Sequence, residues 1–374
     1  MGIITIDIID DMNRYIILLC CVTLLFSCTN EYHEFESDQE QSVYFPIQYP
    51  VRTLVLGESR LDNSIDLQNA FHIGVSVGGG YENTESWTIH YEVDPGLVPE
   101  GMKATNAEGE EVEVKVLPEY YYTLEPENSV VIPKGSFNGL IRVNLSDAFF
   151  EDELSNSFNY VIPLRITESD GPKILSGTPL VEDPDLHDAT HWTTQGKPHH
   201  FTLFGVKFIN AYDGVFFHRG KQFKMDSAGE FVLEKEFAYD EFEKGQTANV
   251  STIVIDRSTY DRMGEWQDGS NYQTVLEFTD KEYGEGVISV SAPKGADYRV
   301  FGTGKYYDST TQFAKDHGSW MVDPETGEKV PYLTMTLDYF VEGLNGCDYQ
   351  FQDTLVFRSN NVKFETFNPI VPAE

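Results

Sequence analysis

The sequence predicts an all-β protein, and three observations lead to that prediction. Aromatic residues, which suit the pleated and half-buried surface of a strand, make up 13% of the 374 residues. Apolar residues recur at every second position in short segments, which is the period of a strand with one buried face. No amphipathic pattern of helical period extends beyond a turn or two. We therefore expect a β-sandwich followed by a second domain that is either a β-barrel or another β-sandwich.

The chain begins with a predicted targeting segment. Residues 1–11 are acidic and unlike the start of a signal peptide, whereas Met12 is followed by the basic Arg14 and by an apolar run over residues 15–26. A helix needs about 20 apolar residues to span a bilayer, so this run is too short for a membrane anchor. We expect a signal peptide over residues 12–27.

A cysteine follows the apolar run directly, in the order Leu24-Leu25-Phe26-Ser27-Cys28. This stretch resembles the lipobox of bacterial lipoproteins, and the resemblance implies that Cys28 is the lipid attachment site. Residues 28–41 are polar and acidic, which predicts a flexible tether. Acidic residues behind the cysteine are similar to the surface-export signal of Bacteroidetes lipoproteins. The expected location is the outer membrane on its extracellular side, with contact to the membrane through the lipid anchor only.

Residues 42–170 carry the alternation of the first domain. Apolar and polar residues alternate along residues 71–78, 87–93 and 112–116. Turns such as Gly78-Gly79-Gly80 and Asp94-Pro95-Gly96 separate these segments. Short strands at this spacing predict a sandwich.

Residues 171–198 lose the alternation and are rich in proline and glycine, so we expect a linker between the domains there. The alternation returns over residues 199–368, most clearly along residues 333–339. Residues 201–209 are apolar on both faces, as in a central strand, and we assign them to the second domain. Only Cys347 remains inside the mature body, so no intramolecular disulfide is expected.

Two groups of segments carry a resemblance to a known class of proteins. Residues 43–46, 52–57 and 122–143, with Val130-Val131-Ile132-Pro133-Lys134-Gly135 among them, resemble the immunoglobulin-like or Calx-beta-like N-terminal domain of Bacteroides surface lipoproteins. Residues 355–358 and 362–364 resemble the closing strands of calycin-like C-terminal domains in the same group. Such lipoproteins are encoded with polysaccharide-utilisation systems. The resemblance implies a polysaccharide or oligosaccharide ligand and, as partners, components of an outer-membrane transporter.

Charge excludes one class of ligand. The chain has 26 basic and 61 acidic residues and a formal net charge of −35, so it repels phosphate backbones and we expect no nucleic-acid binding. We expect no cofactor, because no glycine-rich loop leads into a helix. The histidines of the linker lack a scaffold for zinc, and no metal site is predicted. Acidic residues after residue 146 would suit calcium but form no EF-hand pattern. The sequence therefore does not decide whether the protein binds calcium.

Aromatic side chains in polar loops are the candidate sugar contacts. Trp266 with Tyr272, and separately Trp320, lie in loops that contain glycine and charged residues. The alternative is that these rings close the ends of a barrel, and the sequence leaves both roles open. The expected function is non-catalytic glycan binding in support of polysaccharide capture and uptake. Surface adhesion or a structural role is the alternative, and a glycoside hydrolase, which would need a defined carboxylate pair, ranks third.

Overall fold

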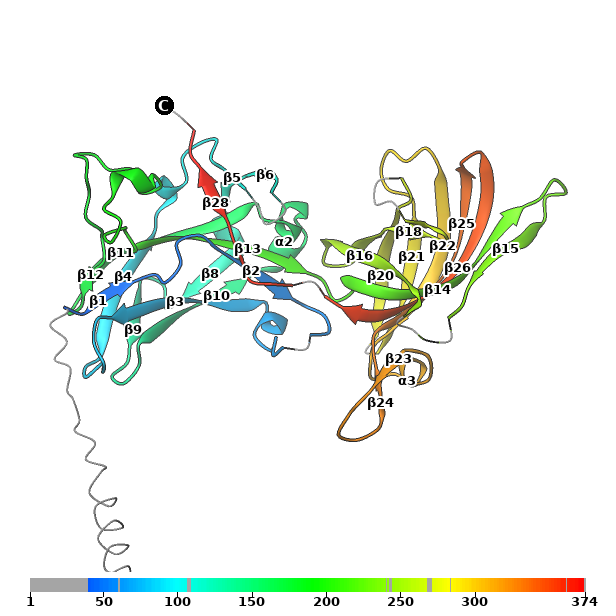
Figure 1. Ribbon diagram of the computed structural model, residues 1–374, viewed down its shortest axis with the longest axis horizontal. Helices are drawn as coiled ribbons and strands as arrows, with labels where there is room; N and C mark the ends of the chain where they lie inside the picture. The colour runs from blue at the N-terminus through cyan, green and yellow to red at the C-terminus, as the bar shows by residue number, and fades with distance from the viewer. Residues whose placement is uncertain are drawn as a thin grey trace, which may run out of the picture. The chain divides into compact units, whose positions relative to one another are not determined.

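The computed structural model describes residues 40–372 except for residues 60, 106–108, 240, 242–243, 268–270, 283 and 361. Strands dominate these residues, and the two α-helices among them, α2 (Asp147–Phe150) and α3 (Gln312–His317), are short (Figure 1). The all-β prediction is therefore confirmed. No helix in this part of the chain has the length and apolar character that crossing a membrane requires. The predicted signal peptide and Cys28 lie outside the described residues.

The N-terminal domain is a sandwich of two sheets, as predicted. The first sheet has the strand order β12 (Lys173–Ile174), β1 (Ser42–Tyr44), β3 (Ala70–Gly78), β10 (Asn138–Leu145) and β8 (Tyr122–Glu125). The second has the order β27 (Glu365–Thr366), β2 (Pro50–Val55), β13 (Phe201–Ile209), β11 (Tyr160–Ser169), β4 (Trp87–Val93) and β9 (Ser129–Ile132), with β7 (Lys115–Val116) beside β11. Alternate side chains of both sheets, among them Phe71, Ile73 and Ile162, are buried together in one core. This burial explains the period of two in the sequence.

A smaller sheet covers the outside of the second sheet. It consists of β28 (Asn368–Ile370), β5 (Lys103–Thr105) and β6 (Glu111–Glu113). Ala104 and Phe367 from this region are buried in one cluster with Phe201 and Leu203 of β13. The other face of β13 contributes Val206 and Phe208 to the sandwich core. Strand β13 is therefore apolar on both faces because both faces are covered.

The expected boundary between the domains needs correction. Strand β13, which we assigned to the second domain, pairs with β2 and β11 of the sandwich. The preceding residues 171–198 are also tied to the sandwich, since β12 pairs with β1 and Trp192 is buried. The chain enters the second domain after β13, between Ile209 and Gly214. The dense prolines and glycines mark an irregular segment packed on the first domain.

The second domain is a closed barrel, which decides between the two predicted options. Its strands in order are β14 (Gly214–Met225), β16 (Gln246–Val254), β17 (Arg257–Tyr260), β20 (Thr274–Glu282), β21 (Glu285–Ser291), β22 (Arg299–Tyr307), β25 (Thr334–Leu344) and β26 (Cys347–Ser359). Each pairs antiparallel with the next, and β26 closes onto β14. Eight antiparallel strands in sequence order form the up-and-down barrel typical of calycins. Strand β15 (Phe231–Phe237) extends the wall from the second half of β14.

Additional segments lie at the two ends of the barrel. The connection from β17 to β20 holds β18 (Arg262–Met263) and β19 (Trp266–Gln267), and the one from β22 to β25 holds α3, β23 (Ser319–Val322) and β24 (Lys329–Pro331). These connections belong to opposite ends, because successive strands of an up-and-down barrel run in opposite directions. The remaining short elements are the 3₁₀ helices η1 (Asp66–Gln68), η2 (Pro95–Leu97), η3 (Glu119–Tyr121), η4 (Glu153–Asn156) and η5 (Ala189–His191).

Large side chains fill the interior of the barrel. Tyr260, Tyr339, Phe216, Phe278 and Phe351 are all fully buried there. Strand β22 accommodates these bulky neighbours with glycines, because Gly302 pairs with Tyr339 and a Cβ atom on Gly302 would lie 2.4 Å from the Cβ of Tyr339.

Candidate ligand-binding groove

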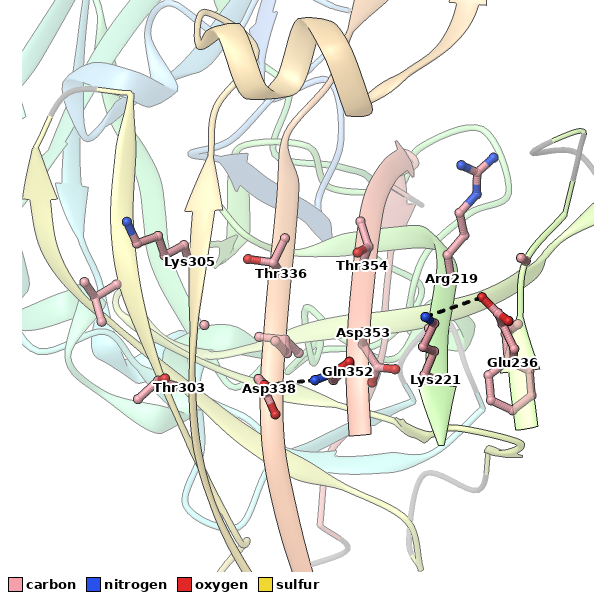
Figure 2. Close-up of a pocket in the computed structure, with 16 residues that line it drawn as sticks. Arg219, Lys221, Glu236, Thr303, Lys305, Thr336, Asp338, Gln352, Asp353 and Thr354 are labelled. Carbon is pink, nitrogen blue, oxygen red and sulfur yellow. Dashed lines mark hydrogen bonds and ion pairs between the residues drawn. The ribbon is translucent and has the colours of Figure 1, made fainter. Parts of the chain in front are cut away.

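The outer wall of the barrel carries a groove of about 710 Å³ across strands β22, β25, β26, β14 and β15. Side chains on these strands alternate between the interior and the outside, so every second residue faces the groove. On β25, for example, Leu337 and Tyr339 are buried whereas Asp338 is exposed. Figure 2 shows the resulting arrangement, in which side chains from neighbouring strands form rows across the wall.

Strand register defines three rows on this wall, of which the first two line the groove and the third lies beside it. The first, here called the cationic row, consists of Lys305, Thr336, Thr354 and Arg219, which pair in that order from β22 to β14. The second, the mixed-charge row, consists of Thr303, Asp338, Gln352, Lys221 and Glu236 and reaches β15. The third, the aromatic row, consists of Phe301, Phe340, Gln350, Phe223 and Leu233. Hydroxyl, amide and charged groups thus lie beside an apolar strip.

Hydrogen bonds fix the carboxylate of the mixed-charge row. Asp338 accepts a bond from Gln350 Nε2 at 2.9 Å on Oδ1 and one from Gln352 Nε2 at 3.2 Å on Oδ2. Lys221 and Glu236 form an ion pair of 3.8 Å at the other end of the row. The carboxylate of Asp338 stays exposed, so it keeps accepting capacity for hydroxyl groups of a ligand.

The cationic row differs in that it contains no carboxylate. Arg219 donates from Nη2 to the backbone oxygen of Tyr239 at 3.1 Å, which positions its guanidinium at one end of the row. Partial burial lowers the pKa of Arg219, but a guanidinium remains charged in a protein. Lys305 is exposed at the other end. Two threonine hydroxyls lie between the two cations.

The aromatic row supplies flat apolar surface. Phe301 is 49% exposed and stacks on Phe340, with 5.5 Å between ring centroids and 18° between ring planes. The ring of Phe231, on β15, also packs against Phe340, with 5.4 Å between ring centroids. An aromatic pair with one exposed ring beside polar side chains is the combination that a sugar ring needs, because sugars have apolar faces and polar edges.

A buried polar network lies behind the wall of the groove. Asp353 of β26 accepts from Tyr260 at 2.9 Å and from Tyr339 at 3.1 Å on Oδ2, and its Oδ1 lies 2.8 Å from His218 Nε2. Burial, followed by the charge of Asp353, raises the pKa of both tyrosines well above the ordinary value, so both phenols remain donors. Gly220 leaves room for this carboxylate, since a Cβ atom there would lie 2.4 Å from Asp353 Oδ1.

Trp266 and Tyr272, two of the predicted sugar contacts, do come together. Their rings stack with 5.5 Å between centroids and 20° between planes, and the edge of Trp266 meets Tyr349 at 5.1 Å. Both rings are partly buried against the barrel core at the end that carries β18 and β19. This packing covers one face of each ring. Their role in sugar binding stays a prediction.

Trp320 lies at the opposite end of the barrel, so the three predicted residues do not form one site. Its indole N–H donates to the backbone oxygen of Phe357 at 2.9 Å, and its ring stacks on Tyr332 at 5.2 Å between centroids. A third ring, Phe217, meets it edge-on at 5.4 Å. These contacts are those of a residue that closes the end of a barrel, and a sugar-binding role of Trp320 also stays a prediction.

The sequence does not single out the residues that form the groove. The polar positions that alternate with Leu337 and Tyr339 are Thr336 and Asp338, and both face the groove. They are ordinary residues for a solvated strand face, so nothing in the sequence distinguishes them from other exposed positions. Strand register is what brings them beside Lys305 and Gln352.

The metal-ligand candidates are used elsewhere. Among the described residues, no group of three or more histidine, cysteine or acidic side chains could hold a metal ion. Asp152 accepts hydrogen bonds from Tyr121 and Tyr160 at 3.0 and 2.6 Å, and caps the short helix that follows it. His187 Nδ1 lies 3.0 Å from the hydroxyl of Tyr49.

Comparisons with known proteins find a family model and two crystal structures that resemble parts or most of this chain, and none of them states an activity. A family model that describes an N-terminal domain, from a Bacteroidetes family, matches residues 37–173. A structural-genomics crystal structure from Bacteroides ovatus, of unknown function, is 28% identical, with a TM-score of 0.73 over 89% of this chain and 99% of that chain. A second one from the same organism, also of unknown function, is 15% identical over 90% and 98% of the two chains, with a TM-score of 0.42. No curated protein matches the sequence. The N-terminal domain thus resembles that of a Bacteroidetes family, and the first of these structures shares the fold over most of this chain.

Proposed function

We propose that this protein is a non-catalytic glycan-binding lipoprotein of the outer membrane that captures polysaccharide for uptake, and that the groove on the barrel wall is its glycan site. The observation that supports this best is the placement of the stacked pair Phe301 and Phe340 beside the mixed-charge row. The aromatic pair offers a surface for the apolar face of a sugar ring. Asp338, Gln352 and Thr303 offer acceptors and donors to its hydroxyl groups.

The spacing of the carboxylates supports binding over hydrolysis. Asp338 and Glu236 are the exposed carboxylates of the groove, and the register places them three strand steps apart. Neighbouring strands are about 4.8 Å apart, so the two groups are separated by roughly 14 Å. Glycosidases need their two carboxylates within about 5 to 9.5 Å of each other. This pair is too far apart for that chemistry.

A glycan array followed by calorimetry with the best ligand tests the proposal. Phe301→Ala removes the exposed ring, and we expect the affinity to fall about tenfold, since stacking on one aromatic ring contributes roughly 1–3 kcal/mol in nucleic-acid binding. Phe364→Ala serves as the matched control, because Phe364 is 71% exposed and belongs neither to the groove nor to the aromatic row beside it. Unchanged binding by the Phe301 variant, or no glycan ligand at all, would refute the proposal.

The membrane location rests on Cys28 and needs its own test. In cells that express Cys28→Ala, the protein should lose its acyl group and leave the membrane fraction. A variant that stays acylated and membrane-bound would show that the lipid is attached elsewhere.

Strand β15 favours a second candidate function, adhesion to another protein. One edge of β15 pairs with β14, and no other strand of the described chain pairs with its second edge. Val232 and Leu233 on this strand are 52% and 48% exposed. An open edge with apolar side chains can add a strand from a partner. Val232→Lys should abolish a protein contact of this kind and leave glycan binding unchanged.

A further inference from the structure

The charges on the groove contrast with those of the chain as a whole. Acidic residues outnumber basic ones by 61 to 26 over the sequence. The charged side chains that face the groove are instead three cations, the partly buried Arg219 and the exposed Lys221 and Lys305, against the two exposed carboxylates of Asp338 and Glu236. A groove for neutral sugars has no need of such a gathering of cations.

The distribution of these charges within the groove is more informative than their sum. Both carboxylates belong to the mixed-charge row, where Asp338 is bound by two glutamines and Glu236 by Lys221. The cationic row next to it carries Lys305 and Arg219 and no acid. Lys305 forms no ion pair with any other residue that the structure describes. Its charge is therefore available to a ligand.

We propose that the groove binds an anionic glycan, one whose sugars carry carboxylate or sulfate groups, with those groups on the cationic row and the hydroxyl groups on the mixed-charge row. The inference rests on the glycan-binding function proposed above and names the class of ligand. Lys305 and Arg219 contact the anionic groups, and Thr336 and Thr354 donate hydrogen bonds between them. Carboxylates and sulfates accept charge-assisted hydrogen bonds from both kinds of cation.

The length of the row sets the length of the ligand. Lys305 and Arg219 lie on strands three steps apart, which corresponds to roughly 14 Å across the wall. A single sugar is too short to contact both cations, so the ligand is an oligosaccharide or a polymer with more than one anionic group. Charges beyond about 8 Å are largely screened at physiological ionic strength, so the row outweighs the more distant acidic surface.

The test compares matched pairs of polysaccharides with the full-length protein by calorimetry. Polygalacturonate is paired with its fully methyl-esterified form, and dextran sulfate with dextran. We expect tighter binding of at least one charged member than of its neutral counterpart, and weaker binding when salt is raised. The two charged polymers distinguish a carboxylate ligand from a sulfate ligand.

Two substitutions tie the effect to the groove. Lys305→Gln should weaken binding of the charged polymer about fivefold, and Lys305→Glu should weaken it further, because an exposed ion pair contributes up to about 1 kcal/mol. Lys315→Gln on α3 is the matched control, since Lys315 is an exposed lysine outside the groove, and it should leave binding unchanged. Melting temperatures of all three variants should match that of the parent protein.

The outcomes separate the inference from the function on which it rests. Equal affinity for charged and neutral members would overturn the anionic ligand and leave glycan binding intact. Binding of a charged polymer that is insensitive to both Lys305 variants would also overturn it, because the contact would lie elsewhere. Failure to bind any polysaccharide, here and on the array, would overturn the glycan-binding function itself.

Discussion

His218 and Asp353 face each other inside the barrel, with 2.8 Å between Nε2 and Oδ1 and neither side chain exposed. The two residues belong to β14 and β26, the strands whose pairing closes the barrel. The same two strands present Arg219, Lys221 and Gln352 on their outer side. The buried contact therefore holds together the strands that form the middle of the groove.

Asp353→Ala should destabilise the barrel strongly. The substitution removes the partner of His218, Tyr260 and Tyr339 and leaves their polar atoms buried without it. Breaking a buried pair of this kind costs about 3–5 kcal/mol. Denaturant unfolding measures the loss. Asp338→Ala, which removes an exposed carboxylate on the neighbouring strand, should change the free energy of unfolding by less than about 0.5 kcal/mol. Equal effects of the two variants would contradict the network.

Trp320→Ala should lower stability, and its effect on glycan binding decides between the two roles that the sequence left open for this ring. The ring is held by a hydrogen bond to Phe357 and packs on Tyr332 and Phe217, so its removal opens a cavity at the end of the barrel. Loss of a large aromatic ring from a core costs about 3–5 kcal/mol, and a partly buried one is expected at or below the lower end. Thermal melts and calorimetric titrations check the two effects separately. Lost binding with an unchanged melt would support the predicted sugar-binding role, whereas unchanged binding with a lowered melting temperature would support the structural role.

Strand β13 should be required for the sandwich to fold. A fragment of residues 41–209 contains the strand, whereas a fragment of residues 41–198 lacks it and exposes the edges of β2 and β11. Each buried apolar side chain of β13 contributes about 1.5–3 kcal/mol. We expect cooperative thermal unfolding of the longer fragment only, as followed by circular dichroism. Equally cooperative melts of the two fragments would contradict this requirement and favour the assignment of β13 to the second domain.

Acid should destabilise the N-terminal domain before it protonates the carboxylates. Burial, reinforced by the charge of Arg165, lowers the pKa of His200 from 6.5 to about 4. The unfolded chain therefore binds a proton at a higher pH than the folded chain, and stability is lost as the pH falls from about 6.5 toward 4. Melting temperatures across this window should fall less steeply for His200→Gln than for the parent protein. His317→Gln is the control, because His317 is exposed. Identical slopes for the parent and the His200 variant would refute the assignment.

The sequence by itself determined the fold class and much of the strand pattern. Alternation along residues 71–77 and 333–339 predicted strands with one buried face, and Phe71, Ile73, Leu337 and Tyr339 are buried as expected. Such local periodicity is reliable because the side chains of a strand point to alternate faces whatever the strand pairs with. The same information predicted residues 201–209 as a central strand.

Only the tertiary structure decided which sheet a strand joins and which residues face one another. Residues 201–209 lie far from β2 in sequence, and no local pattern shows that the two pair. Closure of the barrel depends on the pairing of β14 with β26, which are separated by more than a hundred residues. The groove follows from the same long-range register, since Lys305, Thr336, Thr354 and Arg219 become neighbours only when four strands align. The alternation of apolar and polar residues along a strand shows which residues are exposed. Their neighbours across the sheet are set by backbone hydrogen bonds between segments that are distant in the sequence.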